Sequence, residues 1–470
     1  MKTGGGLWSD WWVPRLGSSL QRLIPPTPLS RRLATQSLLF ATAEGTFLTG
    51  SAVFFTQVVG LRAAQVGLGL TIAGVVSFLV AYPAGKLTDR LGPQRMWAAG
   101  AMVTALMFAA WPFIDSFAGY VTMVVCFEIV ENAGGAGRNA YILDVMPEDE
   151  RVATQAYMYS SLNVGFTLGA MIGGVALAFD NVTVMRWMPL FTLAIGLANA
   201  IFVARLPRAP HDLARLEAKV GAPRVAPHGR GPLHNVGWML ASVCNGTLWT
   251  NQVLLNVVIP LWLVQATDAP HWLLAWLFGT NTVLCIFLPA YTSRGVSTVT
   301  DALRSIRISG VFFVAACLIT MATHSTAGFL TIFLVWLGHV AVTGAELYVS
   351  GASWAFQAKL MDPARRGEYG GVAEVFSTLG GRWAPAVYTL LAMSWHPSAL
   401  PGAGWLVIAG LGLLAVVGMH PSVRMAERFL EREGIVVHEP PDDGSETAAI
   451  PSLTHGATGA LAADDVDALR

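Results

Sequence analysis

The run Gly85-Lys86-Leu87-Thr88-Asp89-Arg90-Leu91-Gly92-Pro93-Gln94-Arg95 decides the fold of this chain. It is a short charged segment with a long apolar stretch on each side. Two helices that cross a bilayer need a polar connection at the water interface, and glycine permits turns that are too tight for other residues. We therefore predict a hairpin loop here, bounded by Gly85 and Gly92, between two membrane-spanning helices.

The composition of the chain also indicates a membrane protein. Its 470 residues are 54% hydrophobic and 12% charged, whereas a soluble domain carries about 25% charged residues. The net charge is zero, which gives no indication of nucleic acid, and we expect no such partner. The four cysteines lie in apolar segments without metal-ligand spacing, so we expect neither a disulfide nor a metal site.

A helix needs about 20 mostly apolar residues to cross the hydrocarbon core of a membrane. Twelve such segments occur, near 33–59, 66–85, 96–114, 118–143, 154–178, 185–205, 237–264, 271–292, 303–323, 327–350, 369–394 and 402–420. These segments predict an all-α integral membrane protein with twelve transmembrane helices.

Basic residues occupy alternate connections between the spans. If the N-terminus is cytoplasmic, they fall on the inside in nearly every loop, and the opposite side holds only Arg62 and Arg186. Loops rich in lysine and arginine stay on the cytoplasmic side of membranes. We therefore expect a multi-pass protein of the cell membrane with both termini in the cytoplasm.

The pattern Gly-x-x-x-Asp-Arg-x-Gly-x-x-Arg, from Gly85 to Arg95, resembles the loop between helices 2 and 3 of the major facilitator superfamily of transporters. The resemblance extends over about residues 30–420 and is strongest to bacterial exporters of drugs and natural products. It implies two six-helix parallel repeats around a central cavity.

The repeat is visible in the sequence itself. The segment 145–151, after the fourth span, is similar to 360–366, after the tenth, whereas Pro289–Gly295 in the second half lacks the Asp-Arg pair of the opening motif. The expected parts are a cytoplasmic N-terminal tail (1–32), an N-terminal six-helix bundle (33–206), a cytoplasmic central loop (207–236), a C-terminal six-helix bundle (237–420) and a cytoplasmic, largely disordered tail (421–470).

The resemblance also implies a gating role for the motif. Asp89 would cap the N-terminus of span 11, near Tyr369 and Gly370, where the helix dipole favours a carboxylate. Arg90 would pair with Asp144 at the end of span 4. The expected gating residues are Gly85, Asp89, Arg90, Gly92, Arg95, Asp144 and Arg138.

Ionisable residues inside the spans are the candidates for coupling. A charge at mid-bilayer costs roughly 3 kcal/mol or more, so it faces a cavity or a partner. The proton-coupling candidates are Glu131, Glu44 and Glu128; the alternative is a carboxyl kept for structure, protonated or paired with Arg138 or Arg382. The resemblance places spans 1, 4, 7 and 10 around the cavity, and the candidates for its polar lining are Asn245, Asn251, Gln252, His339 and Glu346.

Small residues four apart in span 5 predict close helix packing. They are Gly165, Gly169 and Gly173, followed by Gly174. In proton-driven exporters of the superfamily a similar pattern contains a Gly-Pro pair, and here Ala170 stands where that proline would be.

Three functions are consistent with the sequence. The first is a secondary-active exporter of amphipathic small molecules that exchanges them for protons by alternating access. The alternatives are a proton-coupled symporter that imports a small nutrient and a non-transporting membrane sensor or scaffold.

No nucleotide loop, metal cluster or nucleophile–base set is present, so we expect no enzyme, no catalytic residues and no cofactor. The expected energy source is the transmembrane proton gradient, and the expected partners are a small-molecule substrate, protons and the lipid bilayer, with the protein a monomer.

Overall fold

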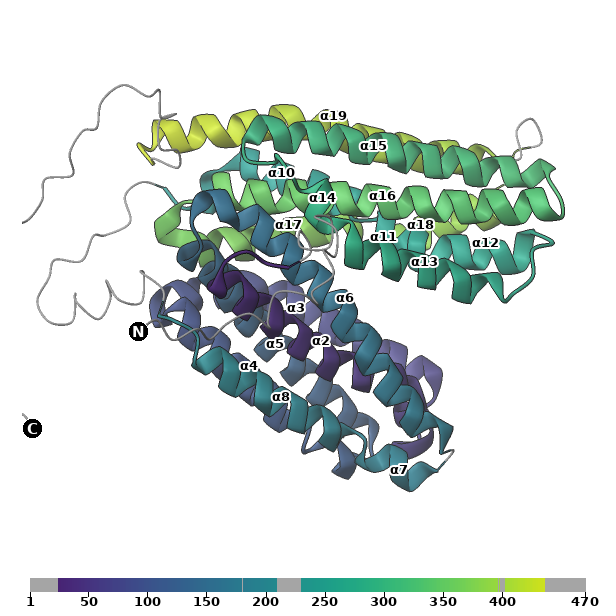
Figure 1. Cartoon of the computed structure of the whole chain (residues 1–470), viewed down its shortest axis with the longest axis horizontal. Coiled ribbons are helices and arrows are strands. Elements are labelled where there is room, and N and C mark those ends of the chain that lie inside the picture. The colour runs from purple at the N-terminus through teal and green to yellow at the C-terminus, as the bar shows by residue number, and fades with distance from the viewer. Residues whose placement is uncertain (1–23, 180, 209–229, 396, 398–401, 436–470) are drawn as a thin grey trace, which may run out of the picture. The chain divides into compact units, whose positions relative to one another are not determined.

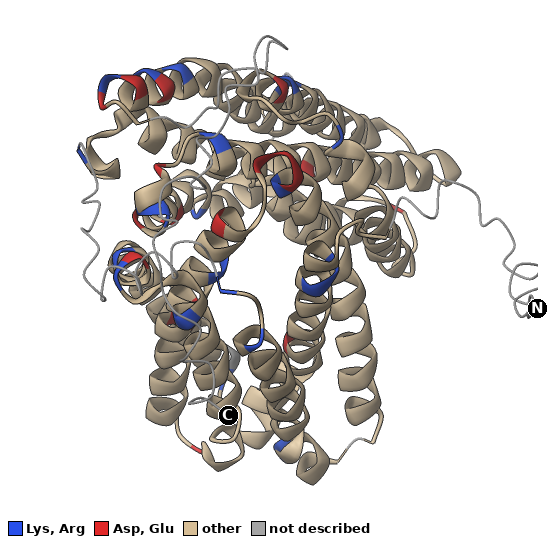
Figure 2. Ribbon diagram, turned by 60° about the vertical axis from the view of Figure 1, so that its left-hand side comes forward, with Lys and Arg blue, Asp and Glu red and all other residues tan. Residues whose placement is uncertain are grey.

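The computed structural model describes residues 24–179, 181–208, 230–395, 397 and 402–435 (Figure 1). Within these ranges the regular elements are all helices. Most of the described residues are uncharged, and the lysine, arginine, aspartate and glutamate residues are grouped in a few places (Figure 2). Residues 1–23 of the expected tail 1–32, most of the expected central loop 207–236 and the residues after 435 lie outside the described ranges.

Six spans form the N-terminal half of the fold. The first is α2, which continues through a π-helical turn at Phe54–Val58. The last is built from two helices, α7 and α8, on either side of Met188. The bounds of these helices are α2 Pro28–Val53, α3 Ala63–Leu91, α4 Pro93–Met107, α5 Phe117–Val145, α6 Glu148–Ala178, α7 Val182–Trp187 and α8 Pro189–Ala204.

Six further spans form the C-terminal half. The seventh span contains a π-helical turn at Leu254–Val258, and the eleventh is interrupted by a turn at Arg382 and Trp383. The bounds are α10 Val236–Leu248, α11 Asn251–Val253, α12 Ile259–Ala266, α13 Leu273–Phe287, α14 Pro289–Thr292, α15 Val299–Ala322, α16 Phe329–Lys359, α17 Arg366–Gly381, α18 Ala384–Thr389 and α19 Ala403–Arg432.

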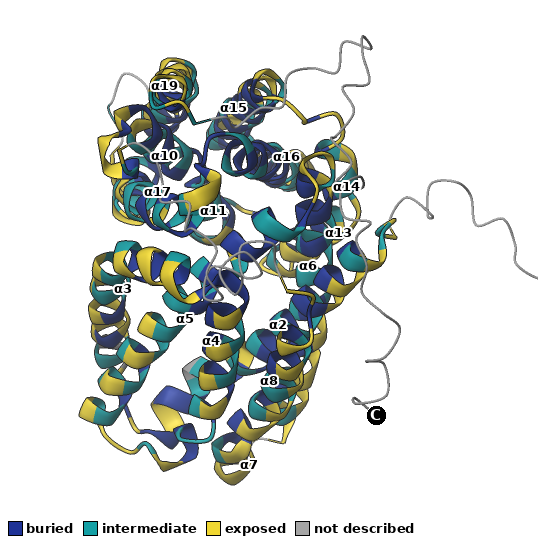
Figure 3. Cartoon of the chain, turned by 90° about the vertical axis from the view of Figure 1, so that its left-hand side faces the viewer, coloured by how far each residue is buried: buried dark blue, intermediate teal, exposed yellow. Residues whose placement is uncertain are grey.

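The chain is therefore an all-α integral membrane protein with twelve transmembrane helices, as the sequence predicts. In the described residues, nine of the helices are long and apolar enough to cross a bilayer by themselves. The other three spans are α2, the short α13, and α17 with α18. Exposed apolar residues follow the outer face of α19, where Leu414 and Val417 are 68% and 63% exposed (Figure 3), as expected for a surface that faces lipid.

The motif that decides the fold is helical rather than a loop. Residues 85–91 are the last two turns of α3, and α4 begins directly after Gly92. Among the motif residues 85–95, Gly92 is the one with a positive φ, at 100°, a conformation that favours glycine. The expected hairpin bounded by Gly85 and Gly92 is thus wrong, because a helix can extend into water with its charged side chains solvated and needs a single residue to turn.

The last helix is longer than the sequence predicts. The apolar segment ends near residue 420, but α19 continues through Pro421 to Arg432. The expected tail 421–470 therefore begins as three further helical turns. At the other end, α2 begins at Pro28, five residues before the apolar segment, and Thr27 and Ser30 form a capping box there.

The span 5 glycines pack α6 against α2. A Cβ atom added to Gly165, Gly169 or Gly173 would lie 2.5 Å from the carbonyl oxygens of Leu38, Thr42 and Thr46, respectively. Each step of four residues on α6 thus meets a step of four on α2, which matches the role predicted for these three glycines. Gly174 faces the other way, and a Cβ there meets nothing within 4 Å.

The second half repeats this packing. Gly380 of α17, which aligns with Gly165 in the sequence repeat, lies against α10, and its Cβ would be 2.2 Å from the carbonyl oxygen of Val243. Span 11 therefore packs on span 7 as span 5 packs on span 1. This correspondence is what two parallel repeats require.

Candidate functional site

The carboxylate of Asp89 binds the first turn of α17. The backbone N–H of Gly367 donates to Oδ1 and that of Glu368 to Oδ2, each at 2.8 Å. These N–H groups have no partner within their own helix and carry the positive end of its dipole, so a carboxylate is stabilised there. The sequence places this cap near Tyr369 and Gly370, and the bonds lie a few residues earlier because α17 begins at Arg366.

Gly85 permits this contact through its size. A Cβ atom on Gly85 would lie 2.0 Å from the carbonyl oxygen of Gly367, and a Cβ on Gly367 would lie 2.3 Å from that of Gly85. One turn along α17, a Cβ on Gly371 would lie 2.6 Å from the carbonyl oxygen of Ala81. The end of α3 and the start of α17 therefore touch through their backbones.

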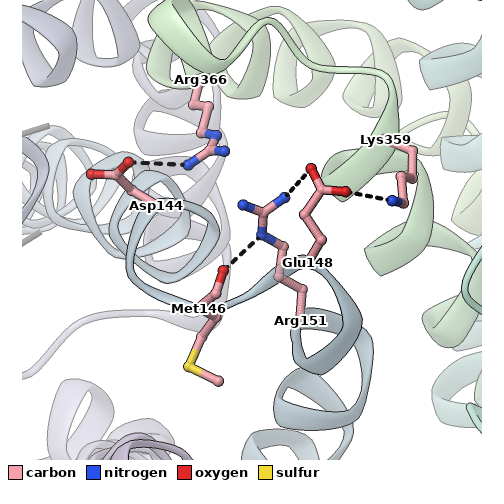
Figure 4. Close-up of polar contacts among 6 residues, drawn as sticks. All are labelled: Asp144, Met146, Glu148, Arg151, Lys359 and Arg366. Carbon is pink, nitrogen blue, oxygen red and sulfur yellow. Dashed lines mark hydrogen bonds and ion pairs between the residues drawn. The ribbon is translucent and has the colours of Figure 1, made fainter. Parts of the chain in front are cut away.

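Asp144 at the end of α5 pairs with Arg366, the first residue of α17, at 3.4 Å between Oδ1 and Nη1 (Figure 4). Arg90 lies exposed on the last turn of α3 and is in no ion pair found among the described residues. The predicted pair of Arg90 with Asp144 is thus wrong, because Arg366 occupies the face of Asp144 that looks across to α17.

A second ion pair joins the halves nearby. Lys359 at the end of α16 donates to Glu148 at the start of α6, at 2.7 Å. Glu148 also pairs with Arg151, whose Nε donates to the carbonyl oxygen of Met146 (Figure 4). Sequence reasoning missed this pair. Its signal was present, because the repeated segments after spans 4 and 10 carry opposite charges.

We name these inter-half contacts the latch. It consists of Asp89, Asp144 and Glu148 in the N-terminal half and of Lys359, Arg366, Gly367 and Glu368 in the C-terminal half. The remaining motif residue, Arg95, is exposed at the start of α4.

A double-mutant cycle on Asp144→Asn and Arg366→Gln is expected to give a coupling energy of about 1–3 kcal/mol. Both side chains are largely buried, so either single change leaves one charge without its partner, which costs more than losing the pair. The midpoint of thermal unfolding of the purified protein measures this. Arg95→Gln, at the same end of the helices, is the control and should leave the midpoint unchanged; strictly additive effects of the first two changes would contradict the pairing.

A cavity of about 690 Å³ lies between the two halves. Its wall runs along α17 from Arg366 at the latch to Arg382, a distance of about 24 Å at 1.5 Å per residue. Three of the residues predicted to line a cavity or to carry protons lie in this wall: Glu128, Glu131 and Asn245. Sequence reasoning did not select Asn132, Gln357 or Glu374, which line it too.

A smaller cavity of about 220 Å³ lies inside the N-terminal half. Glu44, Glu131 and Arg138 line it together, and the charges of Glu44 and Glu131 are near enough to interact. The hydroxyl of Thr104 donates to Oε1 of Glu131 at 3.2 Å, and Arg138 reaches Ser37 at 3.5 Å. Glu131 belongs to the walls of both cavities and therefore connects them.

The other polar candidates lie within the C-terminal half and not in the wall of the larger cavity. Asn251 and His339 are completely buried, and Glu346 is 4% exposed. Glu346 accepts hydrogen bonds from the hydroxyl of Tyr159 on α6 and from Asn281 on α13, the latter at 3.1 Å. Glu346 is thus a contact between the halves rather than part of the cavity wall, and Tyr159 is a partner that the sequence did not indicate. Gln252 likewise does not line the cavity.

Comparison with known proteins identifies the family. The sequence model of the Major Facilitator Superfamily matches residues 33–385, more than half of the chain. The chain belongs to the major facilitator superfamily. It is a multi-pass membrane transporter with twelve transmembrane helices.

Two curated relatives are similar to this transporter over most of their length. A Na⁺, Li⁺, K⁺/H⁺ antiporter of Planococcus maritimus is 24% identical over 396 residues, which cover 78% of this chain and 88% of the relative. The multidrug resistance protein MdtH of Photorhabdus laumondii subsp. laumondii is 24% identical over 378 residues, with the same coverage.

A solved structure shares the fold of this transporter. A bacterial homologue of the iron transporter ferroportin in an outward-facing state has a TM-score of 0.64 at 13% identity, and the match covers 86% of this chain and 100% of that chain.

Proposed function

We propose that this transporter is a secondary-active exporter in the cell membrane that exchanges protons for amphipathic small molecules by alternating access. The names of its relatives, an antiporter and a multidrug resistance protein, support this proposal. The observation that carries it is the position of Glu131, which lines both the cavity between the halves and the smaller cavity that it shares with Glu44 and Arg138.

The charge of this cluster explains how it would use a proton. Two carboxylates and one guanidinium carry a net charge of −1, and one bound proton makes the cluster neutral. Net charge inside the membrane is costly, and like charges in a dry site disfavour each other. A proton would therefore bind to the cluster when no substrate occupies the cavity. It would leave when substrate binds, or when the cavity opens to the other side of the membrane.

The wall of the larger cavity fits an amphipathic substrate. Trp249 and Trp354 offer apolar ring faces, while Asn245, Glu128 and Glu374 offer polar and acidic groups. Binding sites for small molecules combine a mostly apolar wall with a few polar groups in this way. Tryptophan faces also attract cationic groups.

In alternating access the two halves separate at one end of the cavity at a time, and the latch is the set of contacts that must break at its own end. It joins the two halves at one end of the helices, through the two ion pairs and the two bonds to Asp89. We infer that it closes the cytoplasmic end, because the loops there are rich in arginine and lysine. Export then requires the latch to open toward the cytoplasm and to close again behind the substrate.

Everted membrane vesicles from a host without its own exporters test the proposal. A fluorescent amphipathic cation should accumulate inside vesicles that hold a respiratory proton gradient, and its addition should release protons from the lumen. A protonophore should abolish both signals, and vesicles without the protein serve as the control. Proton movement in the same direction as the substrate would show symport instead, and accumulation that is insensitive to the protonophore would contradict proton coupling.

A further inference from the structure

A basic pocket lies far from the transport cavity, between the first turns of α15 and the later turns of α19. Its volume is about 640 Å³. Arg304 and Arg307 stand one turn apart on α15, and His420 and Arg424 stand one turn apart on α19. The two helices run side by side, with α19 antiparallel to α15 (Figure 1).

The arginines of this pocket are available to a ligand. All three are exposed, and none is in an ion pair found within the described ranges. The pocket also contains two carboxylates, Asp301 and Glu427. Asp301 is already engaged, because its Oδ2 accepts hydrogen bonds from the backbone and hydroxyl groups of Thr298. Three arginines against two carboxylates leave the pocket with a net positive charge.

His420 supplies an independent observation. Its Nδ1 is shielded from solvent and has no hydrogen-bond partner among the described residues. A buried polar atom without a partner is costly and rare in native structures. The rest of the ring is partly exposed and lines the pocket beside the three arginines.

An apolar groove of about 480 Å³ lies on the same helix, α19, on the N-terminal side of the pocket. It is lined by Val407, Gly410, Leu411, Leu413, Leu414 and Val417. Leu413, Leu414 and Val417 are more than half exposed, as residues that face acyl chains are. Val417 and Arg424 are seven residues apart, or about 10 Å along the helix axis. A phosphate and the upper part of an acyl chain of one lipid span a comparable length.

We propose that α15 and α19 form a binding site for an anionic phospholipid. The phosphate lies among Arg304, Arg307 and Arg424, and one acyl chain lies in the groove from Val407 to Val417. Arginine holds phosphate oxygens in pairs through its planar fork of N–H donors, and basic pockets between membrane helices bind anionic head groups. The occupant is a lipid rather than free phosphate because the basic pocket and the apolar groove lie on the same helix, with Val417 two turns from Arg424.

Native mass spectrometry of the full-length protein in detergent tests the site. Dioleoylphosphatidylglycerol should bind as one tight copy, in preference to dioleoylphosphatidylcholine and to inorganic phosphate. The variant Arg304→Gln/Arg307→Gln/Arg424→Gln should weaken phosphatidylglycerol binding by about fivefold for each arginine. The matched control is Arg32→Gln/Arg205→Gln/Arg428→Gln, which removes three exposed arginines outside the pocket; equal losses in the two triple variants would overturn the proposal.

A groove variant separates a lipid from a simple anion. A Cβ on Gly410 meets nothing within 4 Å, so Gly410→Phe fills the groove without disturbing the helix packing. It should reduce phosphatidylglycerol binding at least fivefold, whereas Gly174→Phe, which is equally free of contacts, should not. Unchanged binding in Gly410→Phe, or equal binding of inorganic phosphate, would show an anion site without a lipid. The thermal unfolding midpoint of each variant confirms that a loss of binding is not a loss of fold.

Discussion

Replacing Glu131 with glutamine is expected to abolish proton-driven transport while the folded protein stays in the membrane in normal amount. Glutamine has nearly the same shape as a protonated glutamate, and it keeps an oxygen that accepts the hydrogen bond from Thr104. It cannot release a proton. The cluster with Glu44 and Arg138 would thus be held permanently in its proton-loaded charge state.

Two transport assays together separate a coupling role from a structural one. Uptake driven by a proton gradient into everted vesicles should fall to background in Glu131→Gln. Exchange of labelled for unlabelled substrate, which needs no net proton movement, should continue. Loss of both activities would indicate a structural role, and retention of gradient-driven uptake would remove Glu131 from the mechanism.

Glu128→Gln is the matched comparison, since Glu128 lies one turn away and lines the larger cavity but not the smaller one. We expect this variant to retain gradient-driven uptake. If instead Glu128→Gln loses coupling and Glu131→Gln keeps it, the proton carrier is Glu128 and the smaller cavity has no part in coupling.

Gly169→Leu is expected to have the largest effect on folding. The Cβ would lie 2.5 Å from the carbonyl oxygen of Thr42 and 2.7 Å from the backbone nitrogen of Thr46. These are backbone atoms that cannot turn aside as a side chain can, so α6 must move away from α2 along its length. Overpacking costs about 1–3 kcal/mol where neighbours can adjust, and we expect the upper end or more here.

The yield of monodisperse protein in size-exclusion chromatography and its thermal unfolding midpoint measure this effect, and both should fall steeply in Gly169→Leu. Gly174→Leu, five residues along the same helix, meets nothing within 4 Å and should resemble the wild type. Similar behaviour of the two variants would mean that the contact between α2 and α6 does not limit stability.

The sequence predicted the features that repeat or that depend on composition. Apolar segments of about 20 residues located the spans, and the shared segment after spans 4 and 10 identified the duplication. The span 5 glycines predicted a close contact between helices. The three that are four residues apart, Gly165, Gly169 and Gly173, form this contact. Gly174 breaks that spacing and stands outside the contact.

Features that depend on which way a side chain points were not predictable. Arg90 and Arg366 are basic residues on two helices that both contact α5, and only the three-dimensional arrangement brings Arg366 to Asp144. His339 and Asn251 sit in spans that surround the cavity, yet they lie on helix faces that pack within the C-terminal half. The hydrogen bond from Tyr159 to Glu346 joins residues 187 positions apart, a separation at which spacing carries no information.

The bonds that Asp89 receives have an evolutionary consequence. Their donors are main-chain N–H groups, which every residue except proline supplies. Mutation of Glu368 therefore leaves its donor in place, and inheritance of this contact depends on Asp89 and on the two small residues that let the chains meet. On the partner side the requirement is one of size: residue 367 must stay small, because a Cβ there would lie 2.3 Å from the carbonyl oxygen of Gly85.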